Sequence, residues 1–309
     1  MKHKKLWIVV LVCVLVFISS SVAGIVVAAN TVEWSKLSFS DLMDGKFGGL
    51  FESDALGRLF SGRKINRTFD QAYSIDLEGI DTIKITGVSE KLEVGQSESE
   101  QVDCRLYGEY HYVFNEMKYI YEKKGNQLHI HPVYPSFGFF NVNMVQEVLI
   151  PASFAGKVEI GIVSGACTVS STADTKWSSL TFQGVSGSFD CDAAAIGQIR
   201  FNNVSGRVNL EGCTGRVDGE TVSGSVTVSW QTFAGGELNS VSGDIRLQIP
   251  ADASCELRFD SVSGDVSNQG LAFEMTNSSG KKSTYILNAG KNRLDVETVS
   301  GSLTTSPTP

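Results

Sequence analysis

The sequence predicts an all-β fold: a single-stranded parallel β-helix, or solenoid, with coils of about 18–22 residues, preceded by one N-terminal transmembrane helix. The first observation is a tripeptide, Val-Ser-Gly, that occurs seven times at intervals of 22, 19, 18, 19, 21 and 37 residues, the last being close to two ordinary steps. The second is an alternation of apolar and polar residues on both sides of it, as in Leu180-x-Phe182 and Val208-x-Leu210. The third is the lack of helical periodicity across residues 158–267.

Each tripeptide is expected to turn the chain between two short strands. Glycine allows backbone angles that other residues rarely adopt, and serine can bond to nearby backbone at such a bend. A ladder of serines that binds a ligand is the alternative interpretation. A weaker half-repeat at Gly197 and Gly215 suggests a second bend in each coil. The glycines interpreted as structural bend residues are Gly165, Gly187, Gly206, Gly224, Gly243, Gly264 and Gly301.

The N-terminus carries a membrane signal. Residues 1–5 contain three lysines and form a cytoplasmic basic stub, and an uncharged run of 24 residues follows from Leu6 to Ala29. Such a run is long enough to span a bilayer, and the preceding positive charge places the C-terminal domain outside the cytoplasm. A cleavable signal peptide is the alternative for 6–29, because small residues of the cleavage-site kind end the run at Val27-Ala28-Ala29. In that case the domain would be secreted.

The remaining segments follow from composition and period. Residues 30–66 form a juxtamembrane linker, either ordered or a short amphipathic helix that includes Leu50, Phe51, Leu56, Leu59 and Phe60. The solenoid is expected over residues 67–303 and a polar tail over 304–309. Its parts are irregular opening coils or a cap at 67–160, regular coils at 161–267, and interrupted closing coils at 268–303, with a polar loop at 277–283.

The charge of the chain limits its possible partners, and its cysteine positions indicate how the thiols are used. The net charge is −8, and no lysine occurs between Trp177 and Gly280, so the surface would repel nucleic acid. One of the six cysteines, Cys13, lies in the apolar run. The others are Cys104, Cys167, Cys191, Cys213 and Cys255. Of these, Cys167, Cys191 and Cys213 fall at inward positions of the repeat and are expected to be small buried hydrophobes, a disulfide between coils being the alternative.

Few residues suggest chemistry. Asp244 and Asp265 follow the bend glycine in successive tripeptides, and two carboxylates about one coil apart could form a glycosidase pair. Exposed, solvated aspartates are the alternative. His129-x-His131 places two imidazoles on one strand face, which suits a metal but offers no third ligand nearby. No Cys-x-x-Cys, calcium-binding nonapeptide or phosphate-binding loop is present, so no cofactor is expected.

Several short motifs together resemble a known family. They are Ile83-Lys84-Ile85-x-Gly87, Leu92-Glu93-Val94, Leu149-Ile150-Pro151, the Val-Ser-Gly repeats, and the closing run from Asn292 to Gly301. Over residues 68–303 the chain is similar to the putative-adhesin family of bacterial β-strand-repeat proteins of unknown function. The resemblance implies a parallel β-solenoid, often behind an N-terminal membrane anchor, with no established catalytic residues. Some members are similar to accessory proteins of envelope-stress systems.

These observations predict a non-enzymatic, membrane-anchored cell-surface protein. It would contact the membrane through its N-terminal anchor and bind or scaffold a cell-envelope polymer or protein. A link to envelope stress would follow from the resemblance. Two alternatives stay open: a polysaccharide-acting β-helix enzyme that uses Asp244 and Asp265, and a structural polymer that assembles by stacking coil ends.

Overall fold

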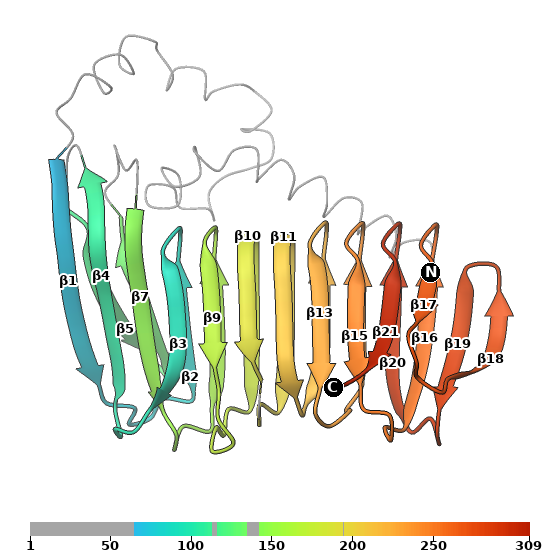
Figure 1. Cartoon of the computed structure of the whole chain (residues 1–309). Helices are drawn as coiled ribbons and strands as arrows, with labels where there is room; N and C mark the ends of the chain where they lie inside the picture. The colour runs from blue at the N-terminus through green and yellow to red at the C-terminus, as the bar shows by residue number, and fades with distance from the viewer. Residues whose placement is uncertain (1–64, 113–115, 135–141, 194) are drawn as a thin grey trace, which may run out of the picture. The chain divides into compact units, whose positions relative to one another are not determined.

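The computed structural model describes residues 65–112, 116–134, 142–193 and 195–309, and this part of the chain contains strands and no helix. No described helix could therefore cross a membrane, and the predicted anchor at 6–29 lies outside the described residues, as does the predicted linker at 30–66 except for its last two residues, which begin the first strand. The chain divides into two compact units. The larger comprises Asp70–Tyr107, Tyr119–Pro132 and Met144–Pro309 and contains the solenoid (Figure 1). In the smaller unit, Arg67 forms an ion pair with Glu116 at 3.2 Å.

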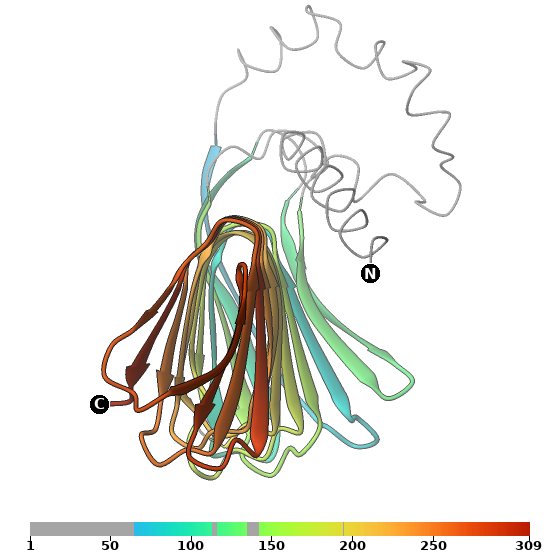
Figure 2. The ribbon, with the colours of Figure 1, turned by 90° about the vertical axis from the view of Figure 1, so that its right-hand side faces the viewer.

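The solenoid consists of two stacks of mainly parallel strands, joined in each coil by the bend (Figure 2). Stack 1 holds the strands that lead into the bends: β2 (Thr82–Gly87), β6 (Gln127–Val133), β8 (Lys157–Ile162), β12 (Arg216–Thr221), β14 (Gly236–Ser240), β16 (Cys255–Ser261) and β20 (Asn292–Thr298). Stack 2 holds those that follow: β3 (Lys91–Ser97), β7 (Val142–Pro151), β9 (Ala166–Ser170), β13 (Ser225–Trp230), β15 (Ile245–Ile249), β17 (Val266–Asn268) and β21 (Leu303–Pro307).

Two longer strands run through the bend and contribute to both stacks. They are β10 (Ser179–Asp192) and β11 (Gln198–Cys213). The remaining strands belong to the two ends of the row of coils: β1 (Ile65–Ile75), β4 (Val102–Tyr112) and β5 (Lys118–Lys124) at one, and β18 (Glu274–Ser279) and β19 (Lys282–Leu287) at the other. The segment at 277–283, expected to be a polar loop, is therefore mostly strand, because a Gly280-Lys281 turn folds it into a hairpin.

The core lies between the two stacks. In most strands of the two stacks alternate residues point inward, so that in-register pairing builds continuous columns of buried residues. One column contains Ile83, Val158, Leu180, Ile199, Val217, Leu294 and Leu257, each at most 1% exposed, with Gly236 between Val217 and Leu294. Across the core, the rings of Phe182 and Phe189 stack at 4.0 Å. Each fully buried side chain of this kind contributes about 1.5–3 kcal/mol, which explains why the period-two pattern predicted the fold.

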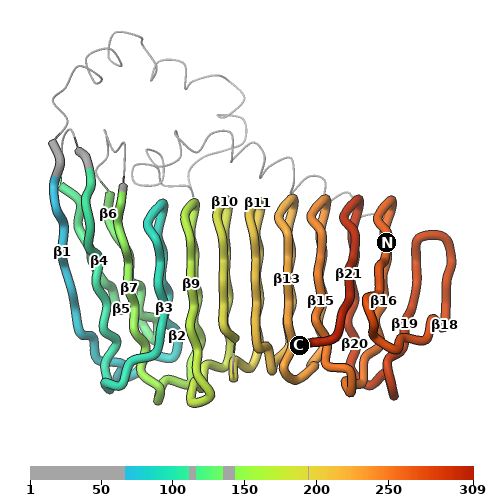
Figure 3. Tube along the Cα trace, in the orientation of Figure 1, coloured from blue at the N-terminus to red at the C-terminus, as the bar shows by residue number. Residues whose placement is uncertain are grey.

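The coils do not stack in the order of the sequence (Figure 3). At one end β2 lies between β6 and β8, and β3 lies between β7 and β9. At the other end β20 lies between β14 and β16, and β21 lies between β15 and β17. The 37-residue interval is therefore not two further steps along the row. Along the sequence, β16 and β17 come first and form the outer coil, and β18 and β19 follow. The chain then forms β20 and β21, which lie between that outer coil and the coil of β14 and β15.

Candidate functional site

The bend glycines form a column along one edge of the solenoid, at spacings too close for any other residue. A Cβ atom at Gly206 would lie 1.8 Å from the carbonyl oxygen of Gly187, and one at Gly243 would lie 1.7 Å from that of Gly224. The same close approach recurs along the row, with Gly301 between Gly243 and Gly264. The column follows the spatial order of the coils and not the sequence order.

The column contains two kinds of bend. Gly165, Gly187 and Gly206 have φ angles of +115°, +133° and +112°, in the region that favours glycine, whereas the other four bend glycines lie outside it. The two kinds of bend differ in the residue that precedes the valine of the tripeptide. In the second kind it is serine or threonine with a buried hydroxyl, as at Ser240, whose Oγ accepts the N–H of Gly243 at 2.9 Å. The sequence shows these residues but not their role.

The serine of each tripeptide bonds to the neighbouring coil. Ser242, for example, donates its N–H to the carbonyl of Val222 at 2.9 Å and its hydroxyl to the same oxygen at 3.2 Å. All seven hydroxyls donate in this way. The expectation of a local bond was wrong, because stacking brings the carbonyl of the next coil closer than any in the same turn. The bend edge is thus a set of inter-coil bonds in which each serine hydroxyl proton is engaged.

Asp244 and Asp265 lie two coils apart, and not one coil apart as successive tripeptides suggested. The inserted coil, with Ser302 at the equivalent place, lies between them. Asp265 forms an ion pair with Lys281 at 2.7 Å, and Asp244 accepts the N–H of Ser302 at 3.0 Å. Two coils separate backbone positions by about 9–10 Å. Each carboxylate therefore contacts a different partner: Asp265 contacts Lys281, and Asp244 contacts Ser302.

His129 and His131 lie on the outward face of β6 with their rings stacked at 4.3 Å and 23°. The hydroxyl of Thr86 lies 2.8 Å from Nε2 of His129. Because the ring planes are nearly parallel, their nitrogen lone pairs do not converge on one point. Burial, the neighbouring His131 and Lys84 together lower the pKa of His129 to about 4. Among the described residues, no group of three or more His, Cys, Asp or Glu side chains could hold a metal.

The five cysteines of the described chain are free and buried, as the repeat predicted for Cys167, Cys191 and Cys213. Burial raises the pKa of Cys104 to about 11 and the pKa values of Cys213 and Cys255 to about 12. Thiols with such pKa values stay protonated near neutral pH and are poor nucleophiles. They pack in the core and form no disulfide bonds between coils.

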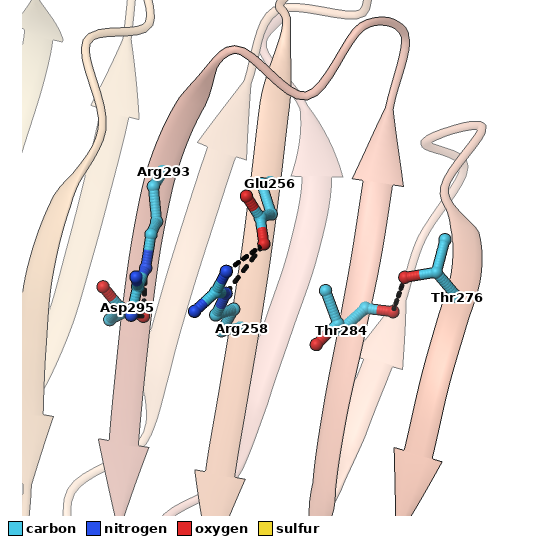
Figure 4. A network of polar contacts seen from close by, with 6 residues as sticks. All are labelled: Glu256, Arg258, Thr276, Thr284, Arg293 and Asp295. Carbon is cyan, nitrogen blue, oxygen red and sulfur yellow. Dashed lines mark hydrogen bonds and ion pairs between the residues drawn. The ribbon is translucent and has the colours of Figure 1, made fainter.

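The outer face of stack 1 is a regular polar surface whose charges pair within single strands. The ion pairs of this kind are Arg216–Asp218 at 2.9 Å, Arg258–Glu256 at 2.6 Å and Arg293–Asp295 at 2.6 Å. Figure 4 shows the last two, with Arg258 placed between Asp295 and Thr284 of the flanking strands. Residues two apart in a strand share a face, so these pairs follow directly from the period-two pattern.

A hollow of about 190 Å³ lies on this face, across β11, β12 and β14. Its polar lining is Arg200, Asn202, Asp218, Glu220, Glu237 and Asn239. Below it, Gly219 leaves room for the ring of Phe201, which a Cβ atom at that glycine would approach to 2.0 Å. We call this lined depression the acidic hollow. Sequence reasoning missed it, since its six side chains come from three strands; the alternating outward residues were the only available signal.

A larger hollow of about 310 Å³ lies near the N-terminal end of the solenoid, against β1, β4 and β7. Of its three charged side chains two are engaged, and the third is Glu147. Arg105 contacts Asp70 at 2.7 Å, and Asp103 accepts the hydroxyl of Ser74 at 2.6 Å. The acidic hollow contains three carboxylates against two in the larger hollow, and two of the three, Glu220 and Glu237, form no ion pair within the described residues, so the acidic hollow is the better candidate for a binding site.

Several solved structures are similar to this chain at low sequence identity. The chain is similar to a putative cell adhesion protein from Clostridium sporogenes, with 12% identity, coverage of 78% of this chain and 100% of that chain, and a TM-score of 0.43. It is also similar to a putative adhesin from Bacteroides fragilis (11%, 77% and 97%, TM-score 0.40) and to a putative lipid binding protein from Parabacteroides distasonis (13%, 79% and 97%, TM-score 0.34). No curated protein matches the sequence. The model of the family described as Toastrack DUF4097 matches residues 156–305, so this part of the β-solenoid is similar to that family.

Proposed function

We propose that this protein is a non-enzymatic, membrane-anchored cell-surface protein that binds or scaffolds envelope components through the outer face of stack 1. The observation that supports this most is the acidic hollow, where outward polar side chains stand at fixed intervals on a rigid sheet. The names of the similar adhesion proteins point the same way. The anchor itself is proposed from the sequence, namely the uncharged run at 6–29 behind three lysines.

The chemistry of the hollow favours a partner with amine or hydroxyl groups. Glu220 and Glu237 project from adjacent strands, and Asn202 and Asn239 flank them. Carboxylates accept hydrogen bonds from hydroxyls and pair with ammonium groups, whereas they repel phosphate. Strands recur about every 4.8 Å, so an extended polymer could contact several coils at once. An envelope polysaccharide or peptide with amino groups fits this surface.

The test is co-sedimentation of the full-length chain in mild detergent with wall sacculi, with sugar release assayed in the same tubes. We expect retention without sugar release, and loss of retention when Glu220→Gln and Glu237→Gln are combined. The matched control changes two outward carboxylates on adjacent strands of stack 2, Asp192→Asn and Glu211→Gln, and should be retained like the natural chain. Sugar release would instead establish an enzyme, and equal retention of both double variants would exclude the acidic hollow.

Membrane anchorage needs its own test. A protease added to intact spheroplasts should digest the solenoid and leave a small membrane-bound N-terminal fragment. Recovery of the whole domain in the culture medium would show that the segment at 6–29 is cleaved.

The proposed link to envelope stress predicts that expression of this protein rises when wall synthesis is inhibited. Unchanged transcript levels would contradict that link.

A further inference from the structure

The two stacks end unequally at the C-terminal side of the solenoid. Beyond β16, stack 1 continues with β19 and β18, which pair antiparallel (Figure 1). Stack 2 ends at β17, a strand of three residues that pairs with β21. Stack 1 therefore extends two strands past the last strand of stack 2, and its inner face there has no opposing strand among the described residues.

The end of stack 2 is closed, whereas the end of stack 1 is open. Asn268, at the end of β17, donates to the carbonyl of Leu271 at 2.7 Å and accepts its N–H at 3.2 Å, which folds the chain away from the edge. By contrast, all six residues of β18 are exposed. They include neither proline nor lysine, the usual blockers of edge strands. The protective features in β18 are the charge of Glu274 at its start and a bulge between Met275 and Asn277.

The inner face of this overhang is apolar around Met275 and Tyr285. Met275 is 60% exposed and lies opposite Tyr285, which in turn lies opposite the core residue Leu257. The ring of Phe273 packs edge-on against Tyr285 at 6.0 Å. An exposed methionine beside two aromatic rings, next to an open strand edge, is the combination found where a further strand is added to a sheet.

We propose that β18 pairs antiparallel with β18 of a second copy of this chain, across a twofold axis between Thr276 and Asn277. An edge strand that meets its own copy across a twofold axis must run antiparallel to it. Met275 then lies opposite Ser278 of the second copy. Both face inward, because the bulge shifts the alternation and Ser278 pairs with the inward Ser283. The bulge thus sets the register of the pairing.

The charges on the hairpin are complementary in this arrangement. Glu274, at the start of β18, forms no ion pair within the described residues. It would lie beside the Gly280-Lys281 turn of the second copy, where Lys281 is still 48% exposed. The contact is symmetric, so both copies gain it, and the twofold closes the assembly at two. A dimer, and not the open polymer considered from the sequence, is the expected product.

Analytical ultracentrifugation of the full-length chain in mild detergent tests the pairing without any envelope ligand, so its outcome is independent of the proposed function. We expect a reversible dimer whose dissociation constant rises at least tenfold in Met275→Lys. The control is Val262→Lys, at a bend valine that is 59% exposed, almost the same as Met275; it should leave the dimer unchanged. A natural chain that stays monomeric, or equal weakening by both variants, overturns the proposal.

The register is tested by disulfide formation in a Cys13→Ser background, where the cysteines of the solenoid are buried. Combining Met275→Cys with Ser278→Cys places two thiols opposite each other across the axis and should give a covalent dimer on oxidation. Each single variant faces a non-cysteine residue and should stay uncrosslinked. Equal crosslinking by the singles, or none by the double variant, contradicts the antiparallel register.

Discussion

Gly206 must be glycine for two separate reasons. Its φ angle of +112° is costly for other residues, and any Cβ atom would overlap the carbonyl oxygen of Gly187 at 1.8 Å. Gly243 has only the second reason, because the hydroxyl of Ser240 holds its bend in a different conformation. The same tripeptide is thus built in two ways, selected by one preceding residue.

Gly206→Ala should lower the free energy of unfolding by about 3 kcal/mol, since backbone strain and overlap with the next coil add. Chemical denaturation measures the change. The control is Gly79→Ala, where φ is also positive, at +73°, but the added Cβ meets open space. It should cost about 1 kcal/mol, the strain alone. Equal losses in both variants would show that inter-coil contact does not require glycine.

His129 should make stability depend on pH. Its pKa is about 4 in the folded chain against an ordinary 6.5, because burial and the charge of His131 disfavour its protonated form. The unfolded chain then binds the proton more readily, so stability from neutral His129 is complete above pH 6.5 and is lost as pH falls toward 4. His129→Gln should flatten this part of the profile. An NMR titration of the ring near pH 6.5 would contradict the prediction.

At the scale of elements, the important feature is the insertion of the last coil between two earlier ones. Both β20 and β21 have hydrogen-bonded neighbours on each side, although they are the last strands of the chain. Their inward residues Leu294, Val296 and Leu303 are fully buried. The C-terminal segment is therefore interior structure, and the preceding hairpin β18–β19 forms the edge.

Hydrogen exchange should reveal this order. Amides of β20 are expected to exchange at least about two orders of magnitude more slowly than those of β18, because opening β20 disrupts the strands on both sides of it. Mass spectrometry of peptides from residues 274–279 and 292–298 measures the two rates within one sample. If the coils stacked in sequence order, the C-terminal peptide would exchange fastest, as a terminal coil does.

At the scale of the whole molecule, stability comes from stacked coils and not from covalent links. The described cysteines are free and buried, and each coil contacts its neighbours through two hydrogen-bonded strands and one bend. In such an array each interface supports the next, so loss of an interior coil affects both sides.

The thiols report on that cooperativity. At pH 8 the five cysteines of the solenoid should not react with a thiol reagent, since burial raises their pKa values and blocks access. Denaturant should expose all of them in a single transition that coincides with the loss of β-sheet circular dichroism. A Cys13→Ser background removes the thiol outside the described residues. Reaction of Cys104 before the others would show that the N-terminal end opens separately.

The sequence by itself determined the repeat, the class of fold and which residues point inward. Period-two alternation and glycine at the bend are local requirements that every coil must meet, so they can be read position by position. The places of Cys167, Cys191 and Cys213 follow from the same alignment. So does the bend at each Val-Ser-Gly, although the partner of its serine does not.

Only the tertiary structure decided which coils are neighbours. Every Val-Ser-Gly unit offers nearly the same edge, so sequence order and the observed order satisfy the local pattern equally, and the choice depends on long-range pairing of β20 with β14 and β16. That choice separates Asp244 from Asp265. The acidic hollow and the overhang of β18 likewise combine side chains from several strands, and no local pattern specifies which strands meet.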